Sequence, residues 1–438
     1  MLNLYAMRDG ILFSPDVDGT IGPSSQFSEK TLKESPGKKG KANLVLNYRN
    51  AQWVYVAIQA LFWITYGLMF AFASVYLQNR SFSNSMIGLT LGCVYALSAF
   101  LQPASSRLFQ YLGWETEQAL RRVYGIATLL TGLLLAVPLS NAWTTILLVI
   151  VFALESAVQP CVDTLARRWT GKGCPVDFGK SRGISSLLYA GMTAGMGLLL
   201  QRIAASLIPA FYLTTMLLSV YILKKLRISG EMNHKKDAGQ SAAATNPLRK
   251  PGFAFMLIGI GCIFFGHVLT DRFMLQIMQS IGGNSQHLGI AMAIASLVEF
   301  PMKLLYSRIR GKIGDYTLLV FSAWAWLAKS VLILLARTPS AIYGAEILQC
   351  CSYGLYIPAS VQVIAHMFPD RENLNAQALA GSAFTVGGVI ATFLGGVLLD
   401  TIGIRFTLGL ITVVMAIGAV LFTFSVGKAA FSVSAEQL

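Results

Sequence analysis

Long apolar blocks dominate this chain and restrict the folds open to it. Each block is near the roughly 20 residues that carry a helix across the hydrocarbon core of a bilayer. Apolar and polar residues do not alternate within the blocks as they do in barrel strands, so helices are predicted. The chain therefore reads as an all-α membrane protein with twelve transmembrane helices. The blocks lie at residues 52–78, 85–110, 123–139, 143–166, 183–204, 206–223, 252–279, 286–306, 317–336, 341–366, 376–399 and 404–427.

Composition places the chain in a lipid bilayer. Only 12% of the 438 residues are charged, against about 25% in soluble domains. The formal net charge of +14 is compatible with a nucleic-acid partner, but the positions of the 34 Lys and Arg residues indicate topology instead. Twenty-seven of them lie in the terminal segments and in loops on the same side. Because Lys and Arg accumulate on the cytoplasmic side, we predict a multi-pass plasma-membrane protein with both termini cytoplasmic and no nucleic-acid partner.

One half of the chain repeats the other. The stretch SMIGLTLGCVYALSAFLQPASSRLFQYLG, at residues 85–113, aligns without a gap with QHLGIAMAIASLVEFPMKLLYSRIRGKIG, at residues 286–314. At this spacing of 201 residues, Gly88 falls on Gly289. Two similar halves of membrane-spanning helices are the plan of alternating-access transporters, which hold their solute between the halves.

Polar segments divide the chain into five parts. We predict a flexible cytoplasmic extension at residues 1–50 and a cytoplasmic linker at residues 224–250, because both are rich in polar residues. Pseudo-symmetric six-helix bundles are predicted at residues 51–223 and 251–427, followed by a cytoplasmic tail at 428–438. Glycines within the fifth and eleventh helices predict either plain close packing or sliding contacts between the halves.

Motifs of enzymes, pumps and metal sites are absent from the sequence. It contains neither a G-x-x-x-x-G-K-[ST] loop nor HExxH, and its six cysteines lack zinc-ligand spacing with His partners. We therefore expect no enzyme activity, no cofactor and no metal, with a proton as the coupling ion of a transporter.

Three segments carry a resemblance to a known family: FASVYLQNRSFSNSMIGLTLGCVYALSAFLQP, then QPCVDTLARRW with VDFGKSRGISSLLYA, and ASLVEFP. Over roughly residues 52–427 the chain resembles the oligosaccharide–proton symporter branch of the major facilitator superfamily. The resemblance implies two six-helix bundles, a central cavity open to one side at a time, and uphill uptake driven by protons.

Charges inside a bilayer are costly, so each intramembrane ionisable residue is a candidate for function. By resemblance, Asp163 on the fourth helix and Arg182 on the fifth correspond to the carboxylate and arginine that hold the sugar. Tyr189, two helical turns after Arg182, corresponds to the aromatic residue that stacks on the sugar ring. A carboxylate and a guanidinium together suit vicinal hydroxyls, although a structural salt bridge is the alternative. Glu155 is expected to line the cavity or to point at Arg182.

Glu299 on the eighth helix is the predicted proton carrier. A carboxyl group in a low-dielectric cavity resists ionisation until a cation approaches. Lys329 on the ninth helix is expected to supply that cation, at the place where the resemblance puts an arginine. Lys303 is the rival partner because it follows Glu299 by four residues on the same helical face.

The tenth helix departs from the family. Its proton-carrying histidine falls near Gln349, and an amide does not carry a proton. Glu346 is a possible substitute, one turn before Gln349. His267, with Asp271 and Arg272 one turn further on, is another possible relay. A lone histidine on an apolar helix is more often a satisfied core residue, and Asp271 and Arg272 are alternatively residues of the external interface.

Aromatic residues are dense in the first helix, where Trp63, Tyr66 and Phe70 share a face. Packing against lipid and helices is the favoured interpretation of this face over a platform for solute.

The combined prediction is a monomeric, proton-coupled transporter that takes up a small polar solute: a saccharide, a glycoside or a nucleoside-like compound. The alternatives are a drug or metabolite exporter of the same fold and a membrane sensor that has lost proton coupling.

Overall fold

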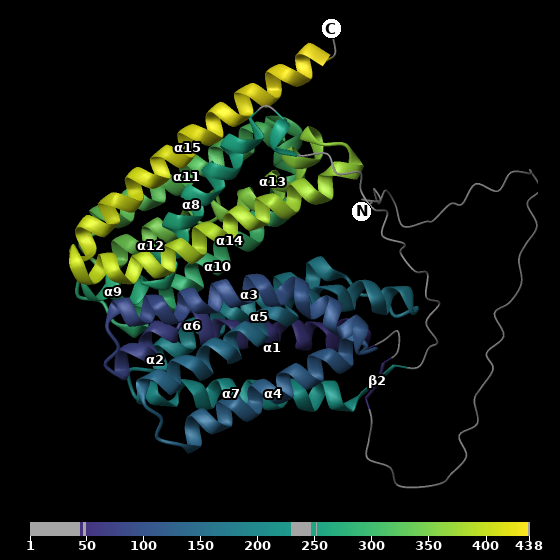
Figure 1. The fold of residues 1–438 in the computed structure, drawn as a ribbon, viewed down its shortest axis with the longest axis vertical. Coiled ribbons are helices and arrows are strands. Elements are labelled where there is room, and N and C mark those ends of the chain that lie inside the picture. Colours follow the sequence, from purple (N-terminus) through teal and green to yellow (C-terminus); the bar gives the residue numbers. More distant parts are fainter. Residues whose placement is uncertain (1–43, 47–49, 229–246, 251, 437–438) are drawn as a thin grey trace, which may run out of the picture. The chain divides into compact units, whose positions relative to one another are not determined.

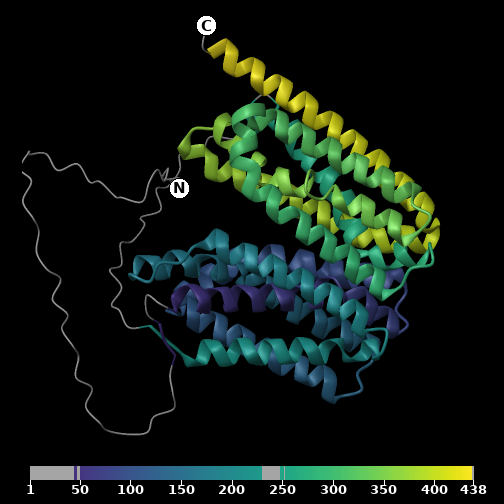
Figure 2. The same ribbon diagram turned by 180° about the vertical axis from the view of Figure 1, so that it is seen from behind.

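The structure, a computed structural model, describes residues 44–46, 50–228, 247–250 and 252–436. Most of the predicted N-terminal extension and of the predicted linker lies outside these residues. The described chain forms two helical halves, coloured purple to teal and green to yellow (Figures 1 and 2). The predicted domain boundaries stay predictions, and the observed elements are as follows.

The first half ends where it began, at a short strand pair. Strand β1 pairs in parallel with β2, with Leu44 opposite Leu226. The elements of the first half are β1 (Leu44–Leu46), α1 (Ala51–Phe70), α2 (Ala73–Asn79), α3 (Asn84–Tyr111), α4 (Thr116–Ala136), α5 (Asn141–Gly171), α6 (Phe178–Leu199), the 3-10 turn η1 (Ala205–Leu207), α7 (Ile208–Lys225) and β2 (Leu226–Ile228).

The second half contains helices and no strand among the residues that the structure describes. Its elements are the 3-10 turn η2 (Pro247–Arg249), α8 (Phe253–Arg272), α9 (Met274–Gln279), α10 (Ser285–Ile313), α11 (Asp315–Leu335), α12 (Pro339–Ile347), α13 (Tyr353–Met367), α14 (Asp370–Thr401) and α15 (Gly403–Glu436).

Ten helical segments among the described residues are long and apolar enough to cross a membrane. They confirm the predicted helical membrane fold. The predicted crossings at 183–204 and 341–366 are not among the ten. They correspond to α6 and to the pair α12 and α13, so a count of twelve stays a prediction for these two.

Helix breaks repeat the internal symmetry of the sequence. The first apolar block is interrupted between α1 and α2, where Phe72 has φ −106° and ψ 6°. The corresponding block of the second half is interrupted between α8 and α9, where Phe273 has φ −107° and ψ 20°. These breaks lie 201 residues apart, the spacing of the repeat. A third break, at residues 348–352, separates α12 from α13.

Two crossings of helices join the halves, α3 with α14 and α6 with α10. Each crossing is close because a glycine faces backbone of the partner helix. A Cβ added to Gly88 would lie 2.4 Å from the carbonyl oxygen of Thr392, and one added to Gly289 would lie 2.3 Å from that of Thr193. Gly197 and Gly396 face the same crossings. Gly197 of the fifth helix and Gly396 of the eleventh are thus contacts between the halves, whereas Gly387 and Gly395 pack against α8 of their own half.

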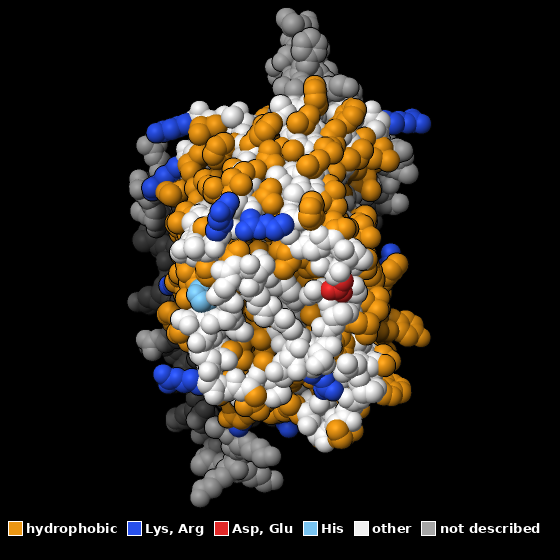
Figure 3. All heavy atoms as spheres, turned by 90° about the vertical axis from the view of Figure 1, so that its left-hand side faces the viewer, with side chains coloured by type: hydrophobic (Ala, Val, Ile, Leu, Met, Phe, Trp, Pro, Cys, Tyr) orange, Lys and Arg blue, Asp and Glu red, His pale blue; other side chains and the backbone are white. Residues whose placement is uncertain are grey.

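Hydrogen bonds between the halves gather toward one end of the helices, here called the distal end, where α2 meets α3 and α9 meets α10. Gln78 and Gln279 exchange amide hydrogen bonds there, at 2.9 and 3.1 Å. Asp400 accepts from Ser85 N at 2.7 Å and from Asn84 Nδ2 at 2.8 Å. Figure 3 faces this end, where uncharged side chains and backbone, both white, cover the middle and Lys, Arg and acidic side chains lie around it. The opposite end, where α7 ends and α8 begins, is called the linker end.

Candidate functional site

A cavity of about 460 Å³ lies between the halves. This volume falls within the usual range for small-molecule sites. The lining comes from α1, α3, α5 and α6 of one half, from α8, α10, α13 and α14 of the other, and from the break before α13. Of the predicted site residues, Arg182, Tyr189, His267, Glu299 and Gln349 line it.

Arg182 faces this cavity from the start of α6. Its guanidinium lies over the ring of Trp63, 3.6 Å from the ring centroid. Among the described residues, its side chain makes no hydrogen bond and no ion pair within 4.0 Å. Tyr189 lies two turns further along α6, lines the same cavity, and packs its ring against Gly67 of α1. A cation–π contact with free N–H donors is a surface that suits a ring bearing hydroxyls.

Asp163 does not form the salt bridge with Arg182 that was the alternative to a shared solute site. Its carboxylate accepts a hydrogen bond from Nε2 of the buried Gln59, at 3.3 Å, and it is not among the lining residues. The α5 backbone thus presents Asp163 toward α1 and away from the open part of the cavity. Asp163 therefore lies outside the cavity lining, bound to Gln59.

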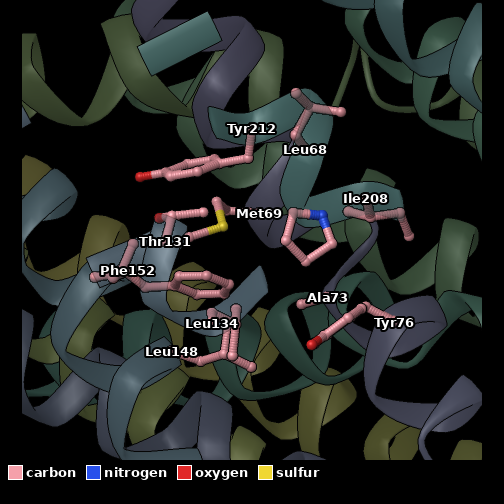
Figure 4. Close-up of a pocket in the computed structure, with 12 residues that line it drawn as sticks. Leu68, Met69, Ala73, Tyr76, Thr131, Leu134, Leu148, Phe152, Ile208 and Tyr212 are labelled. Carbon is pink, nitrogen blue, oxygen red and sulfur yellow. The ribbon is translucent and has the colours of Figure 1, made fainter. Parts of the chain in front are cut away.

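The prediction for Glu155 is wrong, because this residue neither lines the cavity nor contacts Arg182. It is fully buried inside the first half, and its Oε2 accepts from the hydroxyl of Tyr212 at 3.2 Å. Its Oε1 has no hydrogen-bond partner among the described residues. Tyr212 also lines a small apolar hollow of about 20 Å³ with Phe152 and Leu148 (Figure 4). This hollow is the size of one water molecule and is too small for a solute.

A hydrogen-bonded chain of five residues connects α10, α11 and α12. Lys303 donates to Glu299 at 2.7 Å, and Nε2 of Gln349 donates to the other oxygen of Glu299 at 2.9 Å. Lys329 donates to Oε1 of Gln349 at 2.8 Å and to Glu346 at 2.6 Å. The predicted pairing of Glu299 with Lys329 is therefore wrong. Lys303 is the partner of Glu299, because residues four apart on one helix are neighbours regardless of how the other helices are arranged.

The two ends of this chain differ in burial. The side chains of Lys329 and Glu346 are 8% and 4% exposed, whereas those of Lys303 and Glu299 are 36% and 17% exposed. Gln349 joins the buried pair to the cavity pair. Its amide carries no charge, so it fixes the geometry of both pairs but does not pass a proton between them.

His267 lies where the cavity adjoins a second, smaller hollow. It lines both, together with Asp271, and the smaller hollow also contains Lys329 and Glu346. The imidazole packs among aromatic rings, with Trp326 and Tyr353 both at 5.6 Å between centroids. No side-chain hydrogen bond joins it to the carboxylates of the described residues. This environment matches a packed histidine better than a relay.

The aromatic face of α1 lines the cavity, whereas packing against lipid and helices was the favoured interpretation. Trp63 and Tyr66 lie 5.3 Å apart between centroids, and Tyr66 and Phe70 stack at 4.2 Å. Sequence reasoning also missed the role of Arg272 and Tyr95. They line the distal end of the cavity and bind each other, with 2.8 Å between Arg272 Nη2 and the Tyr95 hydroxyl. The internal repeat contains one signal for Arg272: the equivalent residue of the first half is Ala71, so the arginine departs from the repeated pattern.

Known proteins resemble this chain over most of its length. A maltose permease of Geobacillus stearothermophilus is 25% identical over 356 residues, covering 79% of this chain and 87% of that protein. The uncharacterized transporter YwbF of Bacillus subtilis (strain 168) is 22% identical, covering 80% of this chain and 88% of that protein.

Solved structures share the fold. A crystal structure of the nucleoside transporter NupG, as a D323A mutant, superposes with a TM-score of 0.71 at 14% identity, covering 86% of this chain and all of that one. A bacterial homologue of the human lysosomal transporter Spinster, in an inward-facing and occupied conformation, gives 0.58 at 14% identity, covering 89% and 97%.

A family model agrees with these likenesses. The model described as the MFS_1 like family matches residues 119–410, which is more than half of the chain. Together with the two-half helical fold and the central cavity, this match shows that the chain belongs to the MFS_1 like family of major facilitator transporters, which are not enzymes.

Proposed function

We propose that this transporter takes up a saccharide or glycoside in symport with a proton. We further propose that it works as a monomer in the plasma membrane, with the linker end and both termini cytoplasmic. The observation that carries the solute class is the pairing of Arg182 with Trp63 in the central cavity. The likeness to a maltose permease supports the same class.

The chemistry of this wall fits a sugar. Guanidinium N–H groups donate to hydroxyl oxygens, and an aromatic face covers the apolar face of a pyranose ring. Arg182 offers its donors without competition from a carboxylate within 4.0 Å among the described residues, while Gln102, Gln159 and Ser186 add polar groups around the cavity. A nucleoside-like solute is the second candidate, since the aromatic rings of α1 also suit a base.

Glu299 is the proposed proton carrier. It lines the cavity, whereas Glu346 lies behind Gln349. In the observed network two ammonium groups face two carboxylates, so the charges balance when both carboxylates are ionised. Protonation of Glu299 removes the attraction that holds Lys303 and weakens the acceptor for Gln349. Because Gln349 does not pass protons, we expect Glu299 to exchange its proton with water in the cavity.

Uptake into proteoliposomes tests the proposal. The purified protein is offered labelled maltose, other saccharides and nucleosides, with and without an imposed inward proton gradient. We expect saccharide uptake that the gradient drives above the equilibrium level, and its loss in Arg182→Ala. The matched control is Arg202→Ala, because Arg202 is exposed beyond the end of α6.

The alternatives predict other results. Nucleoside accumulation without saccharide accumulation would move the solute class to nucleosides. Movement only in the opposite direction would identify an exporter. Absence of both net transport and exchange over the panel would favour a sensor. Unchanged affinity in Arg182→Ala would remove Arg182 from the solute site.

A further inference from the structure

The distal exit of the cavity is closed around a buried arginine. Arg272 ends α8 and is only 9% exposed. Its Nη1 donates to the carbonyl oxygen of Phe70 at 3.1 Å, and its Nε and Nη2 donate to the Tyr95 hydroxyl at 3.1 and 2.8 Å. Phe70 and Tyr95 belong to the first half of the chain, so one side chain of the second half binds two elements of the other half.

The acceptor on Phe70 is available because α1 breaks there. Phe70 is the last residue of α1, and α2 starts only at Ala73. No backbone N–H of the described residues donates to this carbonyl across the break. The last carbonyls of a helix lack intrahelical partners and carry partial negative charge, which favours a cation. Arg272 therefore caps α1 from the opposite half of the protein.

The contact made by Arg272 has no equivalent at the corresponding position of the internal repeat. The repeat places Ala71 at the position of Arg272, although both halves break at the same point of the repeat. Asp271, whose carboxylate lies 3.5 Å from Arg272 Nη1, is the nearby counter-charge. The helix breaks account for the shape of both halves, whereas the arginine adds a contact between them. Packing within one half does not need that contact.

We propose that Arg272 is a positioning residue of the transport cycle that latches the distal exit closed. In the observed state its charge-assisted hydrogen bonds are satisfied inside the protein. When the halves separate at the distal end, Arg272 leaves Phe70 and Tyr95, and water must replace it on both. Removing the guanidinium therefore shifts the balance toward the distal-open state. This role of Arg272 at the distal exit depends on neither the identity of the solute nor that of the coupling ion.

Distance measurement between spin labels at the distal end tests the latch. Asn141→Cys and Ser340→Cys place labels at the exposed distal starts of α5 and α12, one in each half, in the full chain with its six native cysteines replaced. Without solute, we expect the closed distance to dominate. In Arg272→Gln the ratio of distal-open to distal-closed molecules should rise at least tenfold, which corresponds to about 1.4 kcal/mol.

Three further variants make the test decisive. Tyr95→Phe removes one acceptor and keeps the ring, so a smaller shift in the same direction is expected. Arg272→Lys keeps the charge but loses the fork of donors, so it should fall between wild type and Arg272→Gln. Arg337→Gln, at an exposed arginine of a distal turn, should match wild type.

The proposal is overturned if Arg272→Gln and Tyr95→Phe both reproduce the wild-type distance distribution, or if Arg337→Gln opens the distal end equally. If Arg272→Gln does not fold, Tyr95→Phe and Arg272→Lys decide, and wild-type distributions in both overturn it.

Discussion

Removing Lys329 should destabilise the protein far more than removing Lys303. Both lysines bind a carboxylate at nearly the same distance, 2.6 and 2.7 Å, but only the Lys329–Glu346 pair is buried. Loss of one partner of a buried pair leaves an uncompensated charge, which costs about 3–5 kcal/mol. A partly exposed pair contributes about 0.2–1 kcal/mol. Lys329→Met should therefore lower the free energy of unfolding several times more than Lys303→Met.

A double variant separates the buried charge from the packing. In Lys329→Met combined with Glu346→Leu no charge is left behind, and a hydrophobic pair of similar volume is often neutral. Gln349 still loses the Lys329 donor, which costs about 1 kcal/mol. The double variant should therefore recover most of the stability that Lys329→Met loses.

The double-mutant cycle consists of Lys329→Met, Glu346→Leu and the double variant. Each is unfolded in detergent micelles by heat or denaturant, and the losses in the free energy of unfolding are compared. Two results would refute the reasoning: equal losses in Lys329→Met and Lys303→Met, or a double variant whose loss equals the sum of the two single variants. Either would mean that water reaches the Lys329–Glu346 pair and screens it.

Three further predictions concern other parts of the molecule. Gly289→Ala should prevent the close crossing of α6 and α10 and lower uptake, because the new Cβ meets the Thr193 carbonyl oxygen, whereas Gly191→Ala, with no atom within 4 Å, should transport normally. Tyr212→Phe should lower the free energy of unfolding by about 1–3 kcal/mol by leaving buried Glu155 without its hydrogen bond, and Tyr221→Phe, at a tyrosine that is 58% exposed, is the control. Glu299→Gln should lose uptake driven by a proton gradient but keep solute exchange, because exchange needs no net proton movement; loss of exchange as well would assign Glu299 to the solute site.

Apolar blocks and the internal repeat predicted the helices and the two-half plan, because hydrophobicity over 20 residues and similarity over 29 do not depend on contacts between distant residues. The breaks at Phe72 and Phe273 were not predicted. Neither residue is Gly or Pro, so no local conformational preference marks the position. The breaks are identified only in the structure, where Arg272 donates a hydrogen bond to the carbonyl oxygen left free at Phe70.

Local spacing predicted contacts on one helix better than contacts between helices. The i, i+4 spacing gave Lys303 as the rival partner of Glu299, and the structure contains that pair. Lys329 turns instead toward Glu346, because the rotation of α11 about its axis decides which neighbour its side chain meets. The same rotational freedom explains Glu155, which faces Tyr212 inside the first half, and Trp63, Tyr66 and Phe70, which face the cavity.

Protection of a cavity cysteine by solute tests most directly whether the space between the halves is the solute site. Gln159 lines the cavity from α5, and Gln159→Cys in a background without native cysteines gives one alkylation target. We predict that a transported saccharide slows its alkylation in a saturable manner, and that Arg182→Ala raises the concentration needed. An alkylation rate that stays the same at saturating concentrations of every solute the protein transports would contradict the account.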